Sequence, residues 1–197
     1  MEEKRRRLLD AALEEFAERG YEAASTNRII QQAGMSKGML FHYYSSKKWL
    51  YAAVVDRSLE RIAAFMAEEA SGLPSELLGR IVGVGLAKLR FYLREPAAYK
   101  LLIDAFTGPV PEEVRDVVEE RRRLMAEPLS VRPEDIDMSR LRDGVDPTTA
   151  YDLATGVVNM LCARFIERHR NEPDRGLGRM EAFVEELRQY LQLIESG

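Results

Sequence analysis

Residues 26–48 hold the side chains whose types and spacing best suit binding to a polyanion. No Asp or Glu occurs from Ala23 through Val55, although the whole chain is slightly acidic, with 29 Lys and Arg against 33 Asp and Glu. The cations of this window are Arg28, Lys37, Lys47 and Lys48. A local surface without acids favours a polyanion even where the net charge does not. The alternative is a solvated basic face on a small helical domain.

The spacing of the same window predicts two short helices around a tight turn. Ile29, Ile30 and Ala33 give the first helix an apolar side. Gly34 can adopt a positive φ and end that helix. Ser36 can cap the second helix by accepting a hydrogen bond from an early backbone N–H. Together these features predict a helix-turn-helix, whose second helix can lie in a DNA major groove.

Catalytic chemistry has little support. The two histidines, His42 and His169, are far apart in the sequence, and Cys162 is the single cysteine. No His-x-x-x-His, Cys-x-x-Cys, phosphate loop or nucleophile elbow occurs. We therefore expect no enzyme activity, no metal site and no cofactor. A third class, a helical protein–protein adaptor without DNA binding, stays open as the alternative, although the acid-free window argues against it.

Composition is that of a globular protein outside the membrane. Of the 197 residues, 46% are apolar and 31% are charged. No run approaches the roughly 18 apolar residues of a membrane helix. The basic start is not followed by an apolar signal region, and one cysteine excludes an internal disulfide framework. We expect a cytoplasmic protein with no membrane partner.

The apolar periodicity predicts an all-α fold of about nine helices. Outside the helix-turn-helix, we expect helices over residues 3–19, 47–70, 76–94, 97–106, 112–126, 148–170 and 177–194. Residues 129–146 are expected to be irregular, and 171–176 to form a loop. Gly20 should end the first helix, with Tyr21 folding back on it, and Asp146 should cap the helix from 148.

Four short segments carry a resemblance to a known family. They are TNRI at 26–29, AGMSKG at 33–38, LFHYY at 40–44 and SKKWL at 46–50. In this order they resemble the DNA-binding signature of the tetracycline-repressor (TetR) family. The resemblance is dense over about the first 55 residues, and beyond them it rests on chain length and the all-helical pattern.

The resemblance implies two domains and a mode of action. Residues 1–48 would form the helix-turn-helix domain, and 49–197 a ligand-binding and dimerisation domain, with the helix at 47–70 as the bridge. A homodimer would bind a palindromic operator on double-stranded DNA, most often as a repressor. A small-molecule effector in the second domain would tilt the bridging helix and change the separation of the two recognition helices.

The DNA-contacting residues follow by position in the signature. The expected set is Thr26, Ser36, Lys37, Gly38, Met39, Phe41, His42, Tyr43 and Lys47. Lys37 can donate to guanine O6 and N7, whereas Lys47 resembles the family's phosphate anchor. Thr26 would bind a phosphate at a helix start. Leu40 and one of the tyrosines Tyr43 and Tyr44 are expected in the core.

Three positions depart from the family's pattern. Phe41 stands where the family usually has Tyr, and Met39 where it has Thr or Ser. Each change removes a hydroxyl, and a hydrogen bond to a charged group contributes about 1.5–3 kcal/mol. Ile30 is bulkier than the usual Ala. The single tryptophan, Trp49, is expected either near the DNA backbone or over the seam between the domains.

The helices at 148–170 and 177–194 are the expected dimerisation surface. Both are amphipathic, so two subunits could form a four-helix bundle. Gly156 would allow close approach, and Asn159 could set the register by a buried hydrogen bond. The alternative is that these helices only complete the core of one subunit.

A ligand pocket is expected among the middle helices. The candidate residues are Phe65, Met66, Tyr92, Tyr99, Ile103, Phe106, Met125 and Asn159. Ordinary core packing is the alternative for each of them. Gly79, Gly83 and Gly85 lie inside one predicted helix, where each costs about 1 kcal/mol relative to Ala unless a neighbour or ligand comes close. Asp104 should pair with an arginine or, alternatively, face a ligand.

Overall fold

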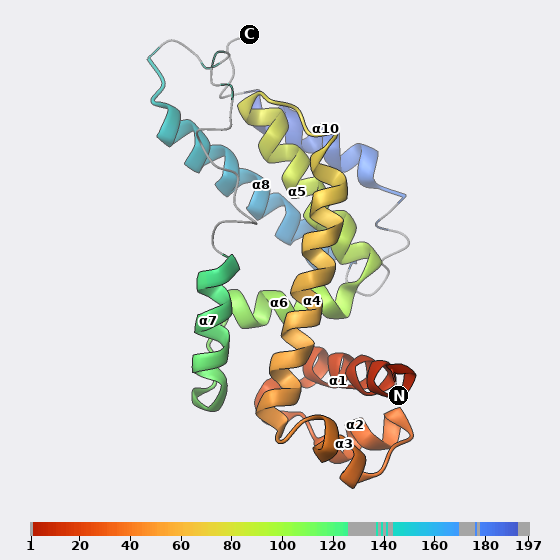
Figure 1. Ribbon diagram of the computed structural model, residues 1–197. Helices are drawn as coiled ribbons and strands as arrows, with labels where there is room; N and C mark the ends of the chain where they lie inside the picture. Colours follow the sequence, from red (N-terminus) through yellow and green to blue (C-terminus); the bar gives the residue numbers. More distant parts are fainter. Residues whose placement is uncertain are drawn as a thin grey trace. The chain divides into compact units, whose positions relative to one another are not determined.

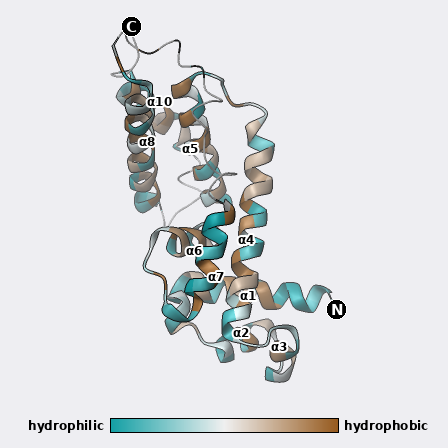
Figure 2. Ribbon diagram, turned by 60° about the vertical axis from the view of Figure 1, so that its left-hand side comes forward, coloured by the Kyte–Doolittle hydropathy of each residue, from teal (hydrophilic) through white to brown (hydrophobic). Residues whose placement is uncertain are grey.

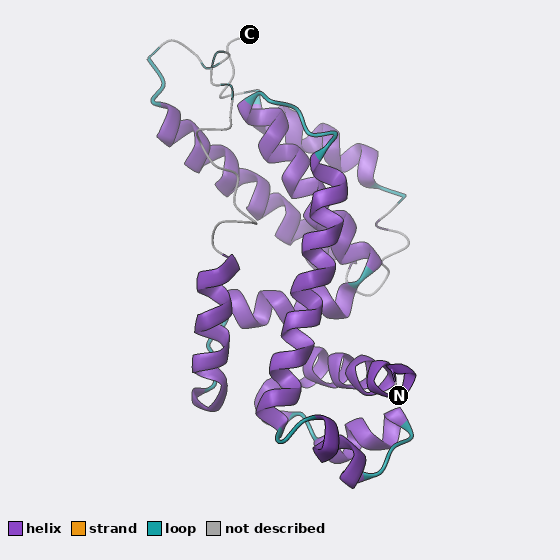
Figure 3. Ribbon diagram, viewed as in Figure 1, coloured by secondary structure: helices purple, strands orange, loops and turns teal. Residues whose placement is uncertain are grey.

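The described residues form helices joined by turns, with no strand among them (Figure 3). A computed structural model describes residues 2–125, 137, 139, 141, 144–169, 176 and 178–192. The expected irregular stretch at 129–146 and loop at 171–176 lie mostly outside the described residues. The all-α prediction is confirmed.

The helices lie close to where the apolar periodicity places them (Figure 1). In order they are α1 (Glu2–Ala23), α2 (Thr26–Ala33), α3 (Lys37–Tyr43), α4 (Lys47–Ala70), α5 (Leu77–Arg94), α6 (Pro96–Thr107), the 3-10 turn η1 (Glu112–Val114), α7 (Arg115–Met125), α8 (Pro147–His169) and α10 (Met180–Leu191). The bridging helix α4 has the bounds expected from the sequence. The last helix is shorter than expected in its described part, because residues 178 and 179 form a turn.

The end of α1 differs slightly from the expectation. Gly20 breaks the helix with φ 71° and ψ 171°, but one further turn continues to Ala23. This backbone conformation favours glycine because it lacks a Cβ. Tyr21 folds back as expected: it is buried and stacks on Phe16 with ring centroids 6.1 Å apart.

One compact unit comprises Met1–Ala64 and Glu95–Pro128. Within it, α1 contacts both α2 and α6. Its largest fully buried side chains come from α1 to α4 and α6: Leu8, Phe16, Ile29, Leu40, Leu50, Val54, Val55 and Leu101. The helix-turn-helix therefore shares a core with α6, a helix that lies far away in the sequence.

A second unit comprises Phe65–Arg94 and Leu129–Gly197. Here α5 packs against α8, and α8 packs against α10. Figure 2 shows apolar residues recurring between polar ones along these helices. A Cβ on Gly85 would overlap Val158 Cγ1, so this glycine allows α5 and α8 to approach closely. The sequence predicts that a neighbour or a ligand comes close to the glycines of this helix. At Gly85 that neighbour is α8.

The N-terminus of α8 has the expected cap. Asp146 Oδ2 accepts hydrogen bonds from the Thr149 backbone N–H at 2.8 Å and from the Thr149 hydroxyl at 2.9 Å. Both bonds lower the pKa of the Asp146 carboxyl. Pro147 takes the first helical position, where a missing N–H has no cost.

The two compact units do not meet at the boundary between residues 48 and 49 that the resemblance implies. The first unit adds α6, η1, α7 and most of α4 to the helix-turn-helix. The functional division into residues 1–48 and 49–197 stays a prediction.

Candidate DNA-binding surface

The turn between α2 and α3 has the geometry expected of a helix-turn-helix. Gly34 adopts φ 64° and ψ 42°, in the left-handed region. Its N–H donates to Gln31 O at 3.2 Å, and the N–H of Met35 donates to Ile30 O at 2.8 Å, which closes the end of α2. Ser36 caps α3, since its Oγ accepts from the Met39 backbone N–H at 3.4 Å. The predicted roles of Gly34 and Ser36 are confirmed.

Helix α3 has one buried residue and a solvent-exposed side. Leu40 is fully buried and fixes the helix to the core. Lys37, Gly38 and His42 are exposed, and Phe41 retains 42% of its surface. A Cβ on Gly38 would meet nothing within 4 Å, so the backbone there is open to a partner.

The remaining residues of α3 and its C-terminus are less exposed. Met39 and Tyr43 are half-buried, and the ring of Tyr43 meets that of His42 edge to face, with centroids 5.6 Å apart. Tyr44 is buried and is therefore the core tyrosine of the pair. Its hydroxyl accepts a hydrogen bond from Arg5 Nε at 3.0 Å, which ties the basic start of α1 to the end of α3.

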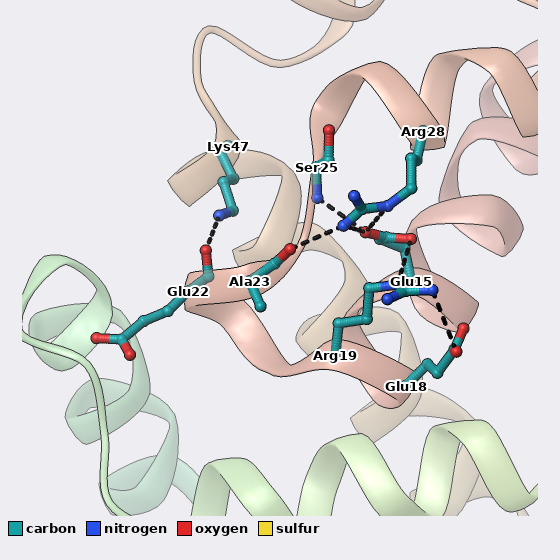
Figure 4. Close-up of polar contacts among 8 residues, drawn as sticks. All are labelled: Glu15, Glu18, Arg19, Glu22, Ala23, Ser25, Arg28 and Lys47. Carbon is teal, nitrogen blue, oxygen red and sulfur yellow. Dashed lines mark hydrogen bonds and ion pairs between the residues drawn. The ribbon is translucent and has the colours of Figure 1, made fainter.

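A buried carboxylate, Glu15, organises the start of α2 (Figure 4). Its Oε1 accepts from the Ser25 backbone N–H at 2.9 Å and from Arg28 Nε at 2.8 Å. Arg28 also donates to Ala23 O at 2.8 Å. The bond from Arg28 is the main cause of the lowered pKa of Glu15. Ser25 itself makes no side-chain cap.

This network limits what the start of α2 offers to a phosphate. One backbone donor, that of Ser25, already belongs to Glu15, and the carboxylate contributes a negative charge beside it. Thr26 is half-buried and lies next to that donor. No local pattern in the sequence indicates the role of Glu15, because its partners Ser25 and Arg28 stand 10 and 13 residues away.

Lys47 is held more firmly than a free surface lysine. Its Nζ donates to Glu22 O at 3.1 Å (Figure 4). The same Nζ lies 4.7 Å from the centroid of the Tyr21 ring. Burial is the main cause of the lowered pKa of the Lys47 ammonium. The side chain thus joins the start of α4 to the end of α1.

Three of the four cations in the acid-free window have partners within the first unit. Besides Arg28 and Lys47, Lys48 Nζ pairs with Asp116 Oδ2 at 2.8 Å, from α7. Lys37 alone of the four makes no hydrogen bond or ion pair with a described residue. The window is free of acids in the sequence, but Glu15 and Asp116 approach it in the fold.

The residues that depart from the signature lie at the surface or near it. Phe41 is exposed, whereas Met39 and Ile30 are half-buried. Trp49 keeps 52% of its surface exposed, and its backbone N–H donates to Ser46 Oγ at 3.3 Å. An exposed tryptophan leaves its ring available to a partner.

The sequence of this region matches a known family. The family model for "Bacterial regulatory proteins, tetR family" matches residues 8–54, the range that includes α2, the turn and α3. This part of the chain, residues 8–54, belongs to the TetR family. This is a family of DNA-binding transcription regulators rather than enzymes.

Curated TetR-family relatives are similar over the N-terminal third. The HTH-type transcriptional repressor Rv1474c of Mycobacterium tuberculosis is 41% identical over 66 residues, which are 34% of this chain and 35% of that protein. The HTH-type transcriptional activator FasR of Mycolicibacterium smegmatis is 43% identical over 63 residues, 32% of this chain and 29% of that protein. The matches span about a third of these relatives' own length.

Solved structures share the fold along nearly the whole chain. A TetR family regulator from Chloroflexus aurantiacus superposes with a TM-score of 0.68 at 23% identity, over 98% of this chain and 92% of that one. FadR from Bacillus subtilis, solved in complex with stearoyl-CoA, gives a TM-score of 0.61 at 16% identity, over 93% and 97%. At these identities the likeness shows the fold alone.

The expected ligand-binding residues are divided between the two units of the TetR-family chain. Phe65, Met66, Tyr92 and Asn159 belong to the second unit. Tyr99, Ile103, Phe106 and Met125 belong to the first. Tyr92 is buried, while Ile103 and Asn159 are exposed. Their assembly into one pocket stays a prediction.

One further expectation is decided by a contact of the described residues. Asp104 pairs with Lys100 one turn away, Nζ to Oδ2 at 2.6 Å, so the expectation of an arginine partner is wrong. No group of three or more metal-ligating side chains occurs within the described ranges. No helix among them is both long enough and apolar enough to cross a bilayer.

The second unit leaves apolar side chains of α8 and α10 uncovered. Leu153 and Met160 on α8 keep 54% and 45% of their surface, and Tyr190 on α10 keeps 41%. Gly156 and Asn159 are exposed between the two α8 residues, and a Cβ on Gly156 would meet nothing within 4 Å.

Proposed function

We propose that this TetR-family protein is a sequence-specific, ligand-responsive regulator of transcription and that it acts as a repressor. The observation that carries the proposal is the outer side of α3, where Lys37, Gly38, Phe41 and His42 face solvent while Leu40 anchors the helix. Affinity for DNA comes largely from phosphate contacts and specificity from base edges. Action as a repressor is favoured by the name of the relative Rv1474c, although FasR is named an activator.

The exposed residues of α3 divide into two proposed roles. Lys37 donates to a guanine, and Gly38 lets the backbone approach a base. The exposed ring of Phe41 carries no hydroxyl that could bind a phosphate. As an apolar group it can instead contact a thymine methyl. His42 and Tyr43 reach bases or phosphates further along, with Met39 beside them.

Phosphate binding is assigned to Thr26, Ser36 and Lys47. An ammonium carries three donors, so Lys47 can keep its bond to Glu22 O and still donate to a phosphate oxygen. This arrangement would hold the charge at a fixed point rather than on a free side chain. The protein would act in the cytoplasm, where it meets DNA.

The proposed partner for specificity is a second copy of the chain. One recognition helix reads few base pairs, so helix-turn-helix proteins bind palindromic sites as dimers. The uncovered side chains Leu153, Met160 and Tyr190 support pairing through α8 and α10. Gly156 leaves room for a close helix, and Asn159 would set the register.

An effector would act by binding the DNA-incompetent state more tightly. A 100-fold preference corresponds to about 2.7 kcal/mol of coupling between the ligand and DNA. The candidates for its contacts are the aromatic and apolar residues named above. FadR, a neighbour in fold, was solved with stearoyl-CoA, which supports a small-molecule effector in general and no particular one here.

A gel shift with random genomic fragments at low salt tests the regulator against the adaptor alternative. We expect a subset of fragments to remain bound as salt is raised, with light scattering showing a dimer at micromolar concentration. Absence of any shifted fragment would support the adaptor. A monomer would contradict pairing through α8 and α10.

A further inference from the structure

Lys88 is a half-buried lysine on α5, in the second unit. Its neighbours in the chain, Ala87 and Leu89, are almost fully buried. The positions three and four residues away on the same side of the helix include Gly85, Phe91 and Tyr92, and the last two are buried aromatic residues. Lys88 therefore stands on a side of α5 whose other residues are apolar or aromatic.

The other cations near the end of α5 have partners among the described residues, and Lys88 differs from them. Arg90 pairs with Glu69, and Arg94 lies over the Phe65 ring at 6.0 Å from the centroid. Lys88 makes no hydrogen bond or ion pair with a described residue. Burial is the main cause of its lowered pKa.

The titratable neighbour of Lys88, Cys162 on α8, does not supply the missing charge. Cys162 Sγ lies 3.8 Å from Gly85 O in the close packing of α5 and α8. Burial raises the pKa of this thiol to about 11, so it is neutral at physiological pH. An ammonium without a counter-ion in apolar surroundings carries a desolvation cost, which a bound anion would offset.

We propose that Lys88 binds the anionic group of a small, largely apolar effector, a carboxylate in the first instance. This inference rests on the proposed ligand-responsive function and names the chemical class of the ligand. One ammonium neutralises one negative charge, which fits a carboxylate better than a dianion. The apolar part of the molecule would lie beside Val84, a half-buried residue one turn before Lys88 on α5. Groups of this kind, charged and poorly solvated, are often functional.

The competing interpretation is structural. A lysine can cover apolar surface with its stem and place its ammonium in water, with no ligand involved. Replacement by methionine keeps the stem and removes the charge, so Lys88→Met separates the two interpretations. Lys100→Met is the matched control, because Lys100 is an exposed lysine of the first unit already paired with Asp104.

The test is calorimetric titration of the full chain with decanoate, decyl phosphate and decan-1-ol below their micellar concentrations. We expect wild type to bind decanoate at least tenfold more tightly than decan-1-ol. The preference should vanish in Lys88→Met and remain in Lys100→Met. Tighter binding of decyl phosphate than decanoate, also lost in Lys88→Met, would keep the anion site and replace the carboxylate by a phosphate.

Several outcomes would overturn the proposal. They are equal binding of the acid and the alcohol by wild type, no binding of any probe, or an acid preference that survives in Lys88→Met. Circular dichroism checks that the variant is folded. If it is not, Lys88→Gln takes its place: it also removes the charge, so the acid preference must vanish.

A gel shift without ligand runs in parallel on the same preparations. If wild type binds no DNA but keeps the acid preference, the regulator proposal fails and the anion site stands. If it binds DNA and shows no acid preference, the role of Lys88 fails alone.

Discussion

The α2–α3 region and the contact between α5 and α8 differ in how their charged side chains are paired. Around α2, Glu15 and Arg28 satisfy each other and the backbone, and Lys47 is held by Glu22 O. Between α5 and α8 the contact is apolar and close enough to require Gly85, and Lys88 nearby makes no hydrogen bond or ion pair with a described residue. The first region is a polar framework that links α1, α2 and α4. The second depends on shape, and we propose that its Lys88 binds a ligand.

The largest effect should come from filling the close contact between α5 and α8. Gly85→Leu would place a side chain where Val158 already lies, and overpacking of this kind costs about 1–3 kcal/mol. We expect the upper end of that range, measured by urea unfolding at fixed protein concentration. Gly38→Ala is the control, because its Cβ would meet nothing within 4 Å and the unfolding is measured without DNA. Equal losses in the two variants would contradict the packing argument.

Next in size is the polar framework at Glu15. Glu15→Gln removes the charge that holds Arg28 and should lower the free energy of unfolding by about 1.5–3 kcal/mol, the range for hydrogen bonds to charged groups. We expect the lower end, because Arg28 is about half exposed. The measurement is urea unfolding at pH 7, with Glu18→Gln on the same helix as the control.

The same variant has a defined pH dependence. The folded-state pKa of Glu15 is lowered, so its contribution is fully present above the unfolded pKa, near 4.3, and is lost as pH falls through the lower folded value. The gap in stability between wild type and Glu15→Gln should therefore close below about pH 4.3. A gap unchanged down to pH 3 would show that the carboxylate charge does not stabilise the start of α2.

Local signals were sufficient for the helices and the turn, but they did not reveal the partners. Gly34, Ser36 and Asp146 act through atoms a few residues away, so their roles could be predicted from spacing. Asp116 reaches Lys48 across 68 residues, and no periodicity indicates such a pair. The acid-free window was therefore a good guide to the surface of α3 and a poor one to which of its cations are free.

The exposed lysine of the first region gives a prediction about specificity. Lys37→Ala should weaken binding to a selected operator by about 1–3 kcal/mol and relax base preference at the contacted position. The free ammonium makes no bond to a described residue, so the folded state should lose little stability. Selection from a random-sequence pool, compared between wild type and variant, measures the change. An unaltered preferred sequence would remove Lys37 from the base-reading set.

The smallest effect on DNA affinity is expected at Lys47. It tests whether a lysine that is bonded within the polar framework also contacts a phosphate. Lys47→Ala should weaken all DNA sequences about equally and reduce the salt slope by about 0.9, the value for one phosphate. The variant also loses the bond to Glu22 O, so its unfolding must be measured beside its binding. Lys47→Arg keeps the charge and should restore the slope. If Lys47→Ala changed stability and left the salt slope as in wild type, Lys47 would belong wholly to the framework, like Arg28, and phosphate binding would fall to other donors on α2 and α3.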